Sequence, residues 1–344
     1  MQITMIGTGY VGLVSGACFS EFGFNVICVD KDDYKIEKLK TNRIPIYEPG
    51  LGALVERNQT AGRLSFTTDL EDAVSRADIV FIAVGTPTRR GDGHADLSYV
   101  FSAAREIAVS MKGYTLVVTK STVPVGTGKQ VFEIIKNKNP GSDFDVASNP
   151  EFLREGSAIN DFMRPDRVVV GTMGEKAKKM LRQIYRPLYL IETPIQFTNL
   201  ETAELIKYAA NAFLAVKISY INQIADLCEN VGADVHDVAK GIGLDKRIGG
   251  KFLHPGPGYG GSCFPKDTLA LVKTAELMGG QISIVEEVIR YNHERKLSMS
   301  ERVLSQLQSD VSGKTISILG LSFKPETDDM RDSPALDIIP ELIS

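Results

Sequence analysis

One cysteine of this chain lies in a setting that suits a reactive thiol. Residues 256–268 read GPGYGGSCFPKDT, so Cys263 stands between a glycine-rich approach and a Pro-Lys-Asp exit. Glycines let a backbone adopt positive φ and pass close to a ligand, and prolines stiffen the loop. A thiolate is a nucleophile that Lys266 can hold ionised, and Asp267 can orient or activate a water. The alternative is a small buried side chain in a tight turn. The flanking residues favour the reactive thiol.

A second pattern, at the N-terminus, predicts a dinucleotide site. An apolar run at residues 2–7 leads into Gly7, Gly9 and Gly12, and then a helical pattern precedes a strand that ends at Asp30. Such glycines provide a tight turn, room for a pyrophosphate, and close packing of helix on strand. Asp30 can accept hydrogen bonds from ribose hydroxyls and would repel a 2′-phosphate. The pattern therefore favours NAD over NADP.

Further apolar strands alternate with helical patterns, and this alternation predicts a doubly wound parallel sheet in an α/β domain. Strands are expected at 64–68, 78–88, 115–124, 144–152, 167–172 and 195–198, and helices at 97–111, 126–138 and 175–186. Ligands of such sheets lie beyond the carboxyl ends of the strands. The segments expected there are GTPT at 85–88, STVP at 121–124 and NPEFLREG at 149–156.

These segments carry side chains with two interpretations each. Thr86 and Thr122 can hydrogen-bond a cofactor or a water, and each can equally well cap a helix. Glu151 and Glu155 are four residues apart and share one face if their segment is helical. They are then either functional carboxylates or a solvated pair.

Residues 200–231 contain neither glycine nor proline, which predicts one helix about 45 Å long. A helix of this length must bridge domains or subunits. Apolar residues cover much of its circumference, so we expect packing on more than one side. Lys207 and Asn211 lie four residues apart, and one face therefore carries both. Lys207 either has a functional role or extends to solvent.

The remainder of the chain predicts a helical domain and the beginning of another. Helical patterns at 234–242, 267–277 and 283–308 indicate an all-α middle domain, and GKTISILGLSF at 313–323 indicates a new strand before a further helix. We expect three domains, at residues 1–198, 199–308 and 309–344. The third is expected to stop one strand and part of a helix into its fold.

Composition excludes several classes of protein. The 344 residues include 39 basic and 43 acidic side chains, and the net charge of −4 gives no general attraction to nucleic acid or to an anionic membrane. The cysteines are widely spaced, without the pattern of a metal site or a disulfide framework. No apolar run approaches the roughly 18 residues that span a bilayer. We expect a cytoplasmic protein with no metal and no nucleic-acid or membrane partner.

Five motifs together resemble the UDP-glucose/GDP-mannose dehydrogenase family, and the resemblance covers essentially the whole chain. They occur in the family's order: MIGTGYVG, NPEFLREG, ELIKYAANAF, GPGYGGSCFPKD and GLSFKPETDDMRDSP. The resemblance implies an N-terminal Rossmann-like NAD domain and a central helical domain that forms a homodimer through the long helix. It also implies a C-terminal Rossmann-like domain that binds UDP.

The resemblance further implies an NAD-dependent, four-electron oxidation of UDP-glucose at C6 to UDP-glucuronate. In this chemistry Cys263 forms a thiohemiacetal and then a thioester. Lys207 and Asn211 match the residues that stabilise developing oxyanion charge. Asp267, Thr122 and Glu151 match the groups that manage water and protons, with Glu151 as the general acid-base.

The same resemblance implies sets of cofactor and substrate contacts. The NAD contacts are Gly7, Gly9, Tyr10, Val11, Gly12, Asp30, Lys35, Thr86, Thr122, Glu155, Lys266 and Arg331. The substrate contacts are Glu151, Phe152, Leu153, Lys207, Asn211, Arg247, Phe252, Leu253, His254, Pro255, Gly256, Gly260 and Lys324, with Arg247 reaching substrate across the dimer.

Other functions remain open at this point. GDP-mannose 6-dehydrogenase shares the cysteine, the helix lysine and the double oxidation, and the wording around Tyr259 leans towards UDP-glucose. UDP-N-acetylmannosamine dehydrogenase is a more distant possibility within the family. A different class is a non-catalytic NAD-binding scaffold or sensor. The joint presence of Cys263, Lys207, Asn211 and Asp267 argues against that class.

Overall fold

The computed structural model describes residues 1–89, 93–307 and 313–343. The chain divides into two compact units, Met1–Gly91 with Ala95–Lys207 and Asp92–His94 with Tyr208–Ser344. The division falls inside α9 (Leu200–Val231), whose bounds are those expected from the sequence. The sequence predicts a boundary two residues before this helix. The boundary predicted after residue 308 lies outside the described residues.

The first unit is built on a sheet of eight strands in the part of the chain that the structure describes. Their order is β3-β2-β1-β4-β5-β6-β7-β8. Strands β1 to β3 are added towards one edge of the sheet, and β4 to β8 are added from β1 towards the other edge. The strands are β1 (Gln2–Ile6), β2 (Asn25–Val29), β3 (Leu64–Thr67), β4 (Ile79–Ile82), β5 (Thr115–Thr119), β6 (Phe144–Ser148), β7 (Val168–Gly171) and β8 (Ile195–Thr198). This order is the Rossmann arrangement, so the predicted α/β fold is confirmed.

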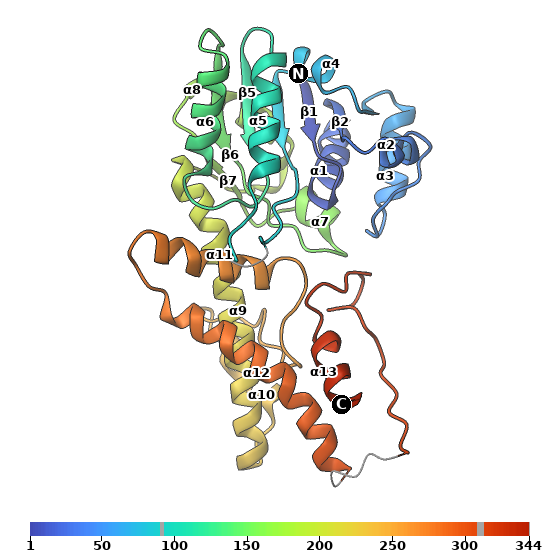
Figure 1. Cartoon of the computed structure of the whole chain (residues 1–344), viewed down its shortest axis with the longest axis vertical. Coiled ribbons are helices and arrows are strands. Elements are labelled where there is room, and N and C mark those ends of the chain that lie inside the picture. Colours follow the sequence, from blue (N-terminus) through green and yellow to red (C-terminus); the bar gives the residue numbers. More distant parts are fainter. Residues whose placement is uncertain (90–92, 308–312, 344) are drawn as a thin grey trace. The chain divides into compact units, whose positions relative to one another are not determined.

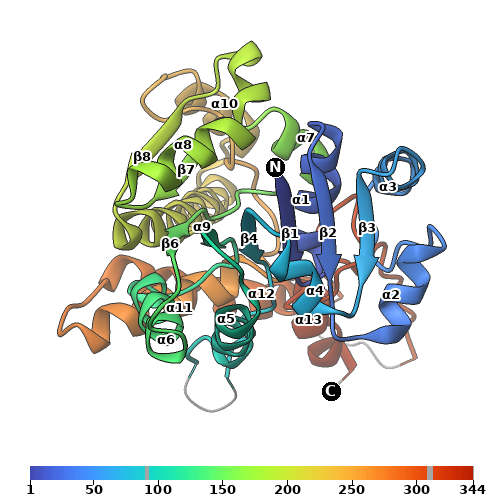
Figure 2. The same ribbon diagram turned by 90° about the horizontal axis from the view of Figure 1, so that it is seen from above.

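Two groups of helices cover the two faces of the sheet (Figure 2). Along β4, Ile79 and Phe81 pack into one core cluster, whereas Val80 and Ile82 pack into the other. The first cluster includes residues of α1 (Tyr10–Glu21), α2 (Asp33–Lys40), α3 (Leu51–Thr60), α7 (Ala158–Met163) and α8 (Glu175–Ile184). The second includes residues of α4 (Leu70–Ser75), α5 (Ser98–Ser110) and α6 (Thr127–Lys138). Burial on both faces explains why the inner strands β4 and β5 are buried at every residue, whereas the edge strand β3 alternates between buried Leu64 and Phe66 and exposed Ser65.

One strand pair departs from the predicted all-parallel sheet. The sheet is parallel from β3 to β6, but β7 pairs with β6 in antiparallel orientation, and β8 runs parallel to β7. The β6–β7 connection contains only the short helix α7. An antiparallel edge on an otherwise parallel sheet is a common variant, and the apolar run of β7 does not distinguish the two orientations.

The second unit is helical, as expected. Besides the C-terminal part of α9 it contains α10 (Val235–Gly243), α11 (Phe264–Leu277), α12 (Ser283–Gln306) and α13 (Pro334–Ile343), all shown in Figure 1. Tyr208 and Ala212 of α9 pack with Leu271 of α11 and Val285 of α12. Gln308, the predicted last residue of α12, lies outside the described residues.

The strand predicted at 313–323 is wrong for this structure. These residues have no regular secondary structure and are mostly exposed, including Leu319 and Leu321. A strand needs a neighbouring strand to accept and donate its backbone hydrogen bonds. No strand lies in the described part of the second unit.

Across all the described residues, no helix is both long and apolar enough to cross a membrane.

Candidate active site

The turn between β1 and α1 has the shape that its glycines predict. Gly7 has φ of +100°, and a Cβ there would lie 2.6 Å from the carbonyl oxygen of Ala83. A Cβ on Gly12 would lie 1.9 Å from the carbonyl oxygen of Gly7. Around Gly9, by contrast, no described atom lies within 4 Å of a Cβ position. Two glycines therefore allow close packing, and the third leaves open space at the N-terminus of α1.

Asp30 follows β2 beside this turn. Its carboxylate accepts hydrogen bonds from the backbone N–H of Thr8 at 2.9 Å, from Thr8 Oγ1 at 2.7 Å and from Lys35 Nζ at 3.1 Å. Burial works to raise the pKa of Asp30, but the hydrogen bonds from Thr8 and Lys35 outweigh it and hold the pKa below its usual range. Asp30 is therefore an anion at neutral pH.

Tyr10, at the start of α1, connects this turn to the segment before α7. Its hydroxyl bonds to the buried Glu48 carboxylate. Glu48 also accepts hydrogen bonds from the backbone N–H groups of Gly156 and Ala158, both at 2.8 Å. Val11 is the next residue of α1, and Glu155 lies in the turn that Glu48 holds. These predicted cofactor contacts thus share one part of the first unit.

Glu151 and Lys207 form a buried ion pair. Lys207 Nζ lies 3.0 Å from Glu151 Oε1, and the two side chains are only 4% and 6% exposed. Glu151 Oε2 accepts the N–H of Leu153 at 2.5 Å. Burial alone would raise the pKa of Glu151, but the charge of Lys207 and these hydrogen bonds lower it below its ordinary value. The proposed solvent-exposed alternative for Lys207 is therefore wrong.

The segment that carries Glu151 is not helical, so the shared face predicted for Glu151 and Glu155 does not form. In the same segment, cationic groups lie over the aromatic ring of Phe152. The Arg167 guanidinium lies 3.6 Å from the ring centre, and Lys207 Nζ lies 5.3 Å from it. Pro150 does not exclude a helix here, because proline is tolerated in a first turn; the segment instead runs as a loop between β6 and α7.

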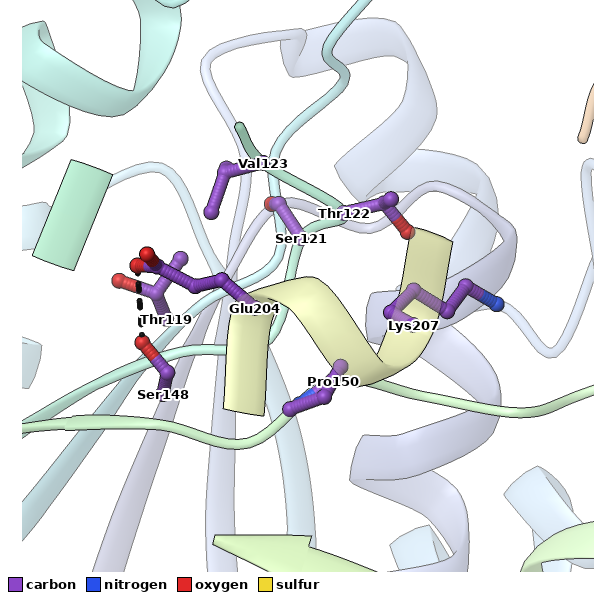
Figure 3. A pocket seen from close by; sticks show the side chains of 8 residues that line it. All are labelled: Thr119, Ser121, Thr122, Val123, Ser148, Pro150, Glu204 and Lys207. Carbon is purple, nitrogen blue, oxygen red and sulfur yellow. Dashed lines mark hydrogen bonds between the residues drawn. The ribbon is translucent and has the colours of Figure 1, made fainter. Parts of the chain in front are cut away.

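Thr86 and Thr122 lie together at the carboxyl ends of β4 and β5. Thr86 Oγ1 donates to the carbonyl oxygen of Thr122 at 2.9 Å. Neither threonine caps a helix, because the residues at the N-caps of α5 and α6 are Leu97 and Gly126. A small cavity beside Thr122 is lined by Thr119, Ser121, Thr122, Val123, Ser148, Pro150, Glu204 and Lys207 (Figure 3). Two predicted catalytic residues, Thr122 and Lys207, therefore line one cavity.

Cys263 occupies the N-cap of α11, in the second unit. The sequence predicts this helix from Asp267, but it begins at Phe264 because proline is tolerated in a first turn, here as Pro265. Cys18, Cys28 and Cys228 are buried, whereas Cys263 is partly exposed. Burial raises the pKa of the Cys28 thiol to about 12. A helix N-terminus favours a thiolate, so Cys263 has the setting of a reactive thiol.

Asp267 lies one turn into α11 and joins three predicted site residues. Its backbone N–H donates to the carbonyl oxygen of Cys263 at 2.8 Å. Its side chain accepts from Asn211 Nδ2 at 2.6 Å and from Lys266 Nζ at 2.6 Å. Asn211 and Asp267 are both buried. Lys266 is thus bound to Asp267, while its predicted action on the Cys263 thiolate stays a prediction.

The glycines before Cys263 allow close packing within the chain. A Cβ on Gly260 would lie 2.3 Å from the carbonyl oxygen of Asp332. Gly261 has φ of +81°, and a Cβ there would lie 2.7 Å from the ring of Phe323. Its N–H donates to the carbonyl oxygen of Arg331 at 2.8 Å. The close approach expected for a ligand is made here by the segment around residues 323–333.

Sequence reasoning missed three residues of α12 that hold this loop. Asn292 accepts the N–H of Tyr259 at 2.8 Å and donates to its carbonyl oxygen at 3.0 Å. Arg295 donates to the carbonyl oxygen of Gly256 at 3.0 Å, and Lys296 to that of Asp332 at 3.0 Å. All three are buried. Their spacing of i, i+3 and i+4 on one helix face was the available signal.

The other predicted substrate contacts are spread over the second unit. Phe252 has φ of +64°, and Leu253 is buried against Ile221 and Ala239. His254 is exposed, Pro255 is partly buried, and Gly256 donates its N–H to Asn222 at 2.8 Å. Arg247 pairs with Asp245, and Arg331, which is a predicted NAD contact, pairs with Asp329; both arginines are exposed. Lys324 Nζ lies 5.6 Å from the centre of the Phe323 ring.

Models of three domains of one protein family match the chain consecutively. They are described as the NAD binding, central and UDP binding domains of the UDP-glucose/GDP-mannose dehydrogenase family, at residues 1–189, 201–294 and 317–344. The chain belongs to the UDP-glucose/GDP-mannose dehydrogenase family. It is 62% identical over 344 residues to a UDP-glucose 6-dehydrogenase of Rhizobium meliloti, covering 99% of this chain and 79% of that protein. It is 54% identical over 342 residues to UDP-glucose 6-dehydrogenase TuaD of Bacillus subtilis, covering 99% and 73%.

Solved structures of family members have the same fold. A UDP-glucose dehydrogenase from Pyrobaculum islandicum matches with a TM-score of 0.94 and 41% identity, over 99% of this chain and 79% of that chain. A GDP-mannose dehydrogenase from Pseudomonas aeruginosa matches with a TM-score of 0.70 and 36% identity, over 100% of this chain and 79% of that chain. The expected resemblance to this family is confirmed.

NAD is the cofactor of the family's first domain, and the residues of this chain fit it. The open space beside Gly9 at the N-terminus of α1 suits a diphosphate. The anionic Asp30 at the end of β2 suits ribose hydroxyls. Residues Thr8 and Lys35 hold that carboxylate in place.

Asp30→Asn should reduce the preference for NAD over NADP. A 2′-phosphate about 4 Å from this carboxylate meets a repulsion of about 1–4 kcal/mol per charge pair, which the neutral amide removes. The measurement is kcat/KM for both cofactors. Asp32→Asn is the matched control, because Asp32 caps α2 two residues further on and should leave the preference unchanged. Equal kcat/KM for NAD and NADP in the parental protein would contradict the role of Asp30.

Proposed function

We propose that this protein oxidises UDP-glucose at C6 twice, with NAD, to give UDP-glucuronate. The observation that carries the proposal is the position of Cys263, a partly exposed thiol at the N-cap of α11 one turn before the buried Asp267–Asn211 pair. Relatives at 62% and 54% identity are UDP-glucose 6-dehydrogenases. A two-step oxidation needs a group that retains the aldehyde between the steps, and a thiolate can do so covalently.

In the first oxidation the chain must remove a hydroxyl proton and stabilise negative charge on oxygen. NAD, when bound, accepts the hydride of each oxidation. Glu151 is ionised because the charge of Lys207 holds its pKa below the ordinary value, so it has the protonation state that a proton acceptor needs. Lys207 and Asn211 lie one turn apart on α9 and can donate hydrogen bonds to the oxygen. Thr122, on the cavity that Lys207 also lines, can hold a water.

In the second oxidation the sulfur of Cys263 bonds to the aldehyde carbon and forms a thiohemiacetal. Loss of a hydride and of the hydroxyl proton from this adduct gives a thioester. Water then adds to the thioester carbon, the carbon–sulfur bond breaks, and UDP-glucuronate leaves with the thiolate restored. Asp267, whose carboxylate is held by Asn211 and Lys266, lies four residues after Cys263 and can orient that water.

The competing substrates are other nucleotide sugars of the same family. A solved GDP-mannose dehydrogenase is 36% identical to this chain, less than the two UDP-glucose 6-dehydrogenases above. The identities therefore favour UDP-glucose. A non-catalytic NAD-binding protein is disfavoured, because it has no need for a partly exposed thiol beside the Asp267–Asn211 pair.

The substrate is tested by supplying UDP-glucose and GDP-mannose side by side and following NADH absorbance. We expect turnover with UDP-glucose and two NADH formed for each UDP-glucose consumed. Higher kcat/KM with GDP-mannose would reassign the substrate. One NADH per substrate, with free aldehyde released, would contradict the covalent second oxidation.

We also propose that the protein forms a homodimer through α9. Phe213, Tyr220 and Leu227 are each more than half exposed and follow one another at intervals of seven residues. Apolar residues at a seven-residue interval form the contact seam of paired helices. An exposed apolar stripe of this kind on the second unit supports burial against a second copy of the chain.

Leu227→Glu should convert the dimer to a monomer, because it buries an unpaired charge in the proposed apolar contact. The measurement is molar mass by sedimentation equilibrium over a range of concentrations. Leu244→Glu is the control: Leu244 is also exposed and apolar but lies outside α9, at the end of α10, so its variant should remain a dimer. A monomeric parental protein would refute the proposal.

A further inference from the structure

Glu204 is a buried carboxylate to which the function proposed above assigns no role. It lies on α9, three residues before Lys207, and is 3% exposed. Its two oxygens accept hydrogen bonds from the backbone N–H groups of Gly126 and Gly128, each at 2.7 Å, and from Ser148 Oγ at 3.1 Å. Figure 3 shows Glu204 turned towards Ser148 and Thr119, while Lys207 leaves the same helix in another direction.

These contacts cap α6 from another element. The N-cap of α6 is Gly126, which has φ of +93° and no side chain to accept the first N–H groups of the helix. Such groups need an acceptor when they are buried, and a negative charge at a helix N-terminus is favourable. Glu204 provides both. A Cβ on Gly128 would lie 3.0 Å from Glu204 Oε1. Glycine at this position therefore avoids a steric clash with the carboxylate.

The capped segment is the one that carries Thr122. At its beginning, Ser121 Oγ donates to the carbonyl oxygen of Val84 at 2.7 Å, and Thr86 Oγ1 donates to that of Thr122 at 2.9 Å. At its end, Gly126 and Gly128 are held by Glu204. The loop between β5 and α6 is therefore fastened to the segment that follows β4 on one side and to α9 on the other.

We propose that Glu204 is a positioning residue for the oxidation: it fixes the loop of residues 121–128, and with it Thr122, relative to Lys207 on α9. This inference rests on the proposed function, because Thr122 and Lys207 have catalytic roles only there. Misplacement of catalytic groups by about 1 Å lowers rates by up to about 100-fold. A rigid connection between the two residues is thus expected to affect turnover more than it affects cofactor binding.

Glu204→Gln is the principal test. Glutamine has the same shape but only one accepting oxygen, and its NH₂ group faces a backbone N–H. We expect kcat with UDP-glucose at pH 8 to fall about 10- to 100-fold, with KM for NAD within about twofold of the parental value. Glu201→Gln is the matched control, because Glu201 also joins α9 to α6 but through the side chain of Lys129 at 2.5 Å. Its kcat should stay near the parental value.

The pH dependence separates positioning from a purely structural role. Burial raises the pKa of Glu204 to about 7, and the charge of Glu201 on the same helix also raises it. The hydrogen bonds from Gly128, Gly126 and Ser148 act in the opposite direction and lower this pKa. The other charged groups nearby are Lys129 on α6 and Lys207. As the pH falls below about 7 the carboxyl gains a proton and loses accepting capacity, as glutamine does. The ratio of parental to Glu204→Gln kcat should therefore fall towards one between pH 8 and pH 6. A ratio independent of pH would overturn the positioning role.

A second variant and a measurement without turnover complete the test. Ser148→Ala keeps both amide bonds but removes a hydrogen bond that lowers the pKa of Glu204, so the acid-side fall in kcat should move to higher pH. Amide hydrogen exchange in a peptide covering residues 121–130 should accelerate about tenfold or more in Glu204→Gln and not in Glu201→Gln. Unchanged exchange would overturn the proposal even if UDP-glucose is not the substrate. Parental kcat in Glu204→Gln would overturn it while leaving the oxidation itself intact.

Discussion

Replacing Cys263 with alanine should lower the overall formation of UDP-glucuronate by on the order of 10³-fold or more, because no other group can retain the aldehyde as a thioester. The variant keeps Lys207 and the β1–α1 turn, so the dissociation constant for NAD should stay within about twofold of the parental value. The measurements are UDP-glucuronate formed per unit time and NAD binding by calorimetry. Cys228→Ala is the control, because Cys228 is a buried thiol of the same unit and its loss should leave turnover within about threefold.

Cys263→Ser tests the chemistry of the intermediate. A serine hydroxyl is far less acidic than a thiol, and an ester hydrolyses more slowly than a thioester. The variant should stall with the sugar nucleotide covalently attached, which mass spectrometry of the intact protein detects after incubation with UDP-glucose and NAD. Near-parental product formation by Cys263→Ala would remove the covalent role and leave Cys263 as a packing residue at the start of α11.

Lys207→Met should lower turnover by about 10²- to 10³-fold and also destabilise the fold. The first effect is the loss of a donor to the developing oxyanion. The second arises because Glu151 remains as a buried carboxylate without its partner, and breaking such a pair costs about 3–5 kcal/mol of unfolding free energy. The measurements are kcat with UDP-glucose and the free energy of unfolding in denaturant.

A double variant separates these two effects of Lys207. Glu151→Gln/Lys207→Met removes both charges, so it should regain much of the stability that Lys207→Met loses but none of its turnover. Lys217→Met is the control: Lys217 lies on α9 and donates to the carbonyl oxygens of Ile248 and Gly249, both at 3.1 Å. Its turnover should stay close to that of the parental protein. Restored turnover in the double variant would contradict both the oxyanion role of Lys207 and the role of Glu151 as proton acceptor.

Much of the site depends on local features that a sequence states directly. The turn at Gly7, Gly9 and Gly12 was predictable because a tight turn with positive φ and close backbone contacts requires glycine. The uninterrupted helix at 200–231 was predictable because no glycine or proline breaks it. The partly exposed thiol of Cys263 was predictable from the glycine and proline residues around it.

Features that depend on distant segments were not predictable in the same way. The strand expected at 313–323 does not form, because its apolar pattern specifies a pairing surface but not the strand that must pair with it. The antiparallel orientation of β7 is likewise a property of its connection to β6.

The sequence by itself determined the Rossmann unit, the long helix, and which residue types are available for chemistry, since these follow from periodicity and from glycine and proline positions. Only the tertiary structure decided how those residues are paired. Lys207 meets Glu151 and Asn211 meets Asp267 across 56 residues in each case, and Glu204 meets Gly126 across 78. Such pairs form because a polar group buried by the fold must find a partner there, and a linear pattern does not say which distant group that partner is.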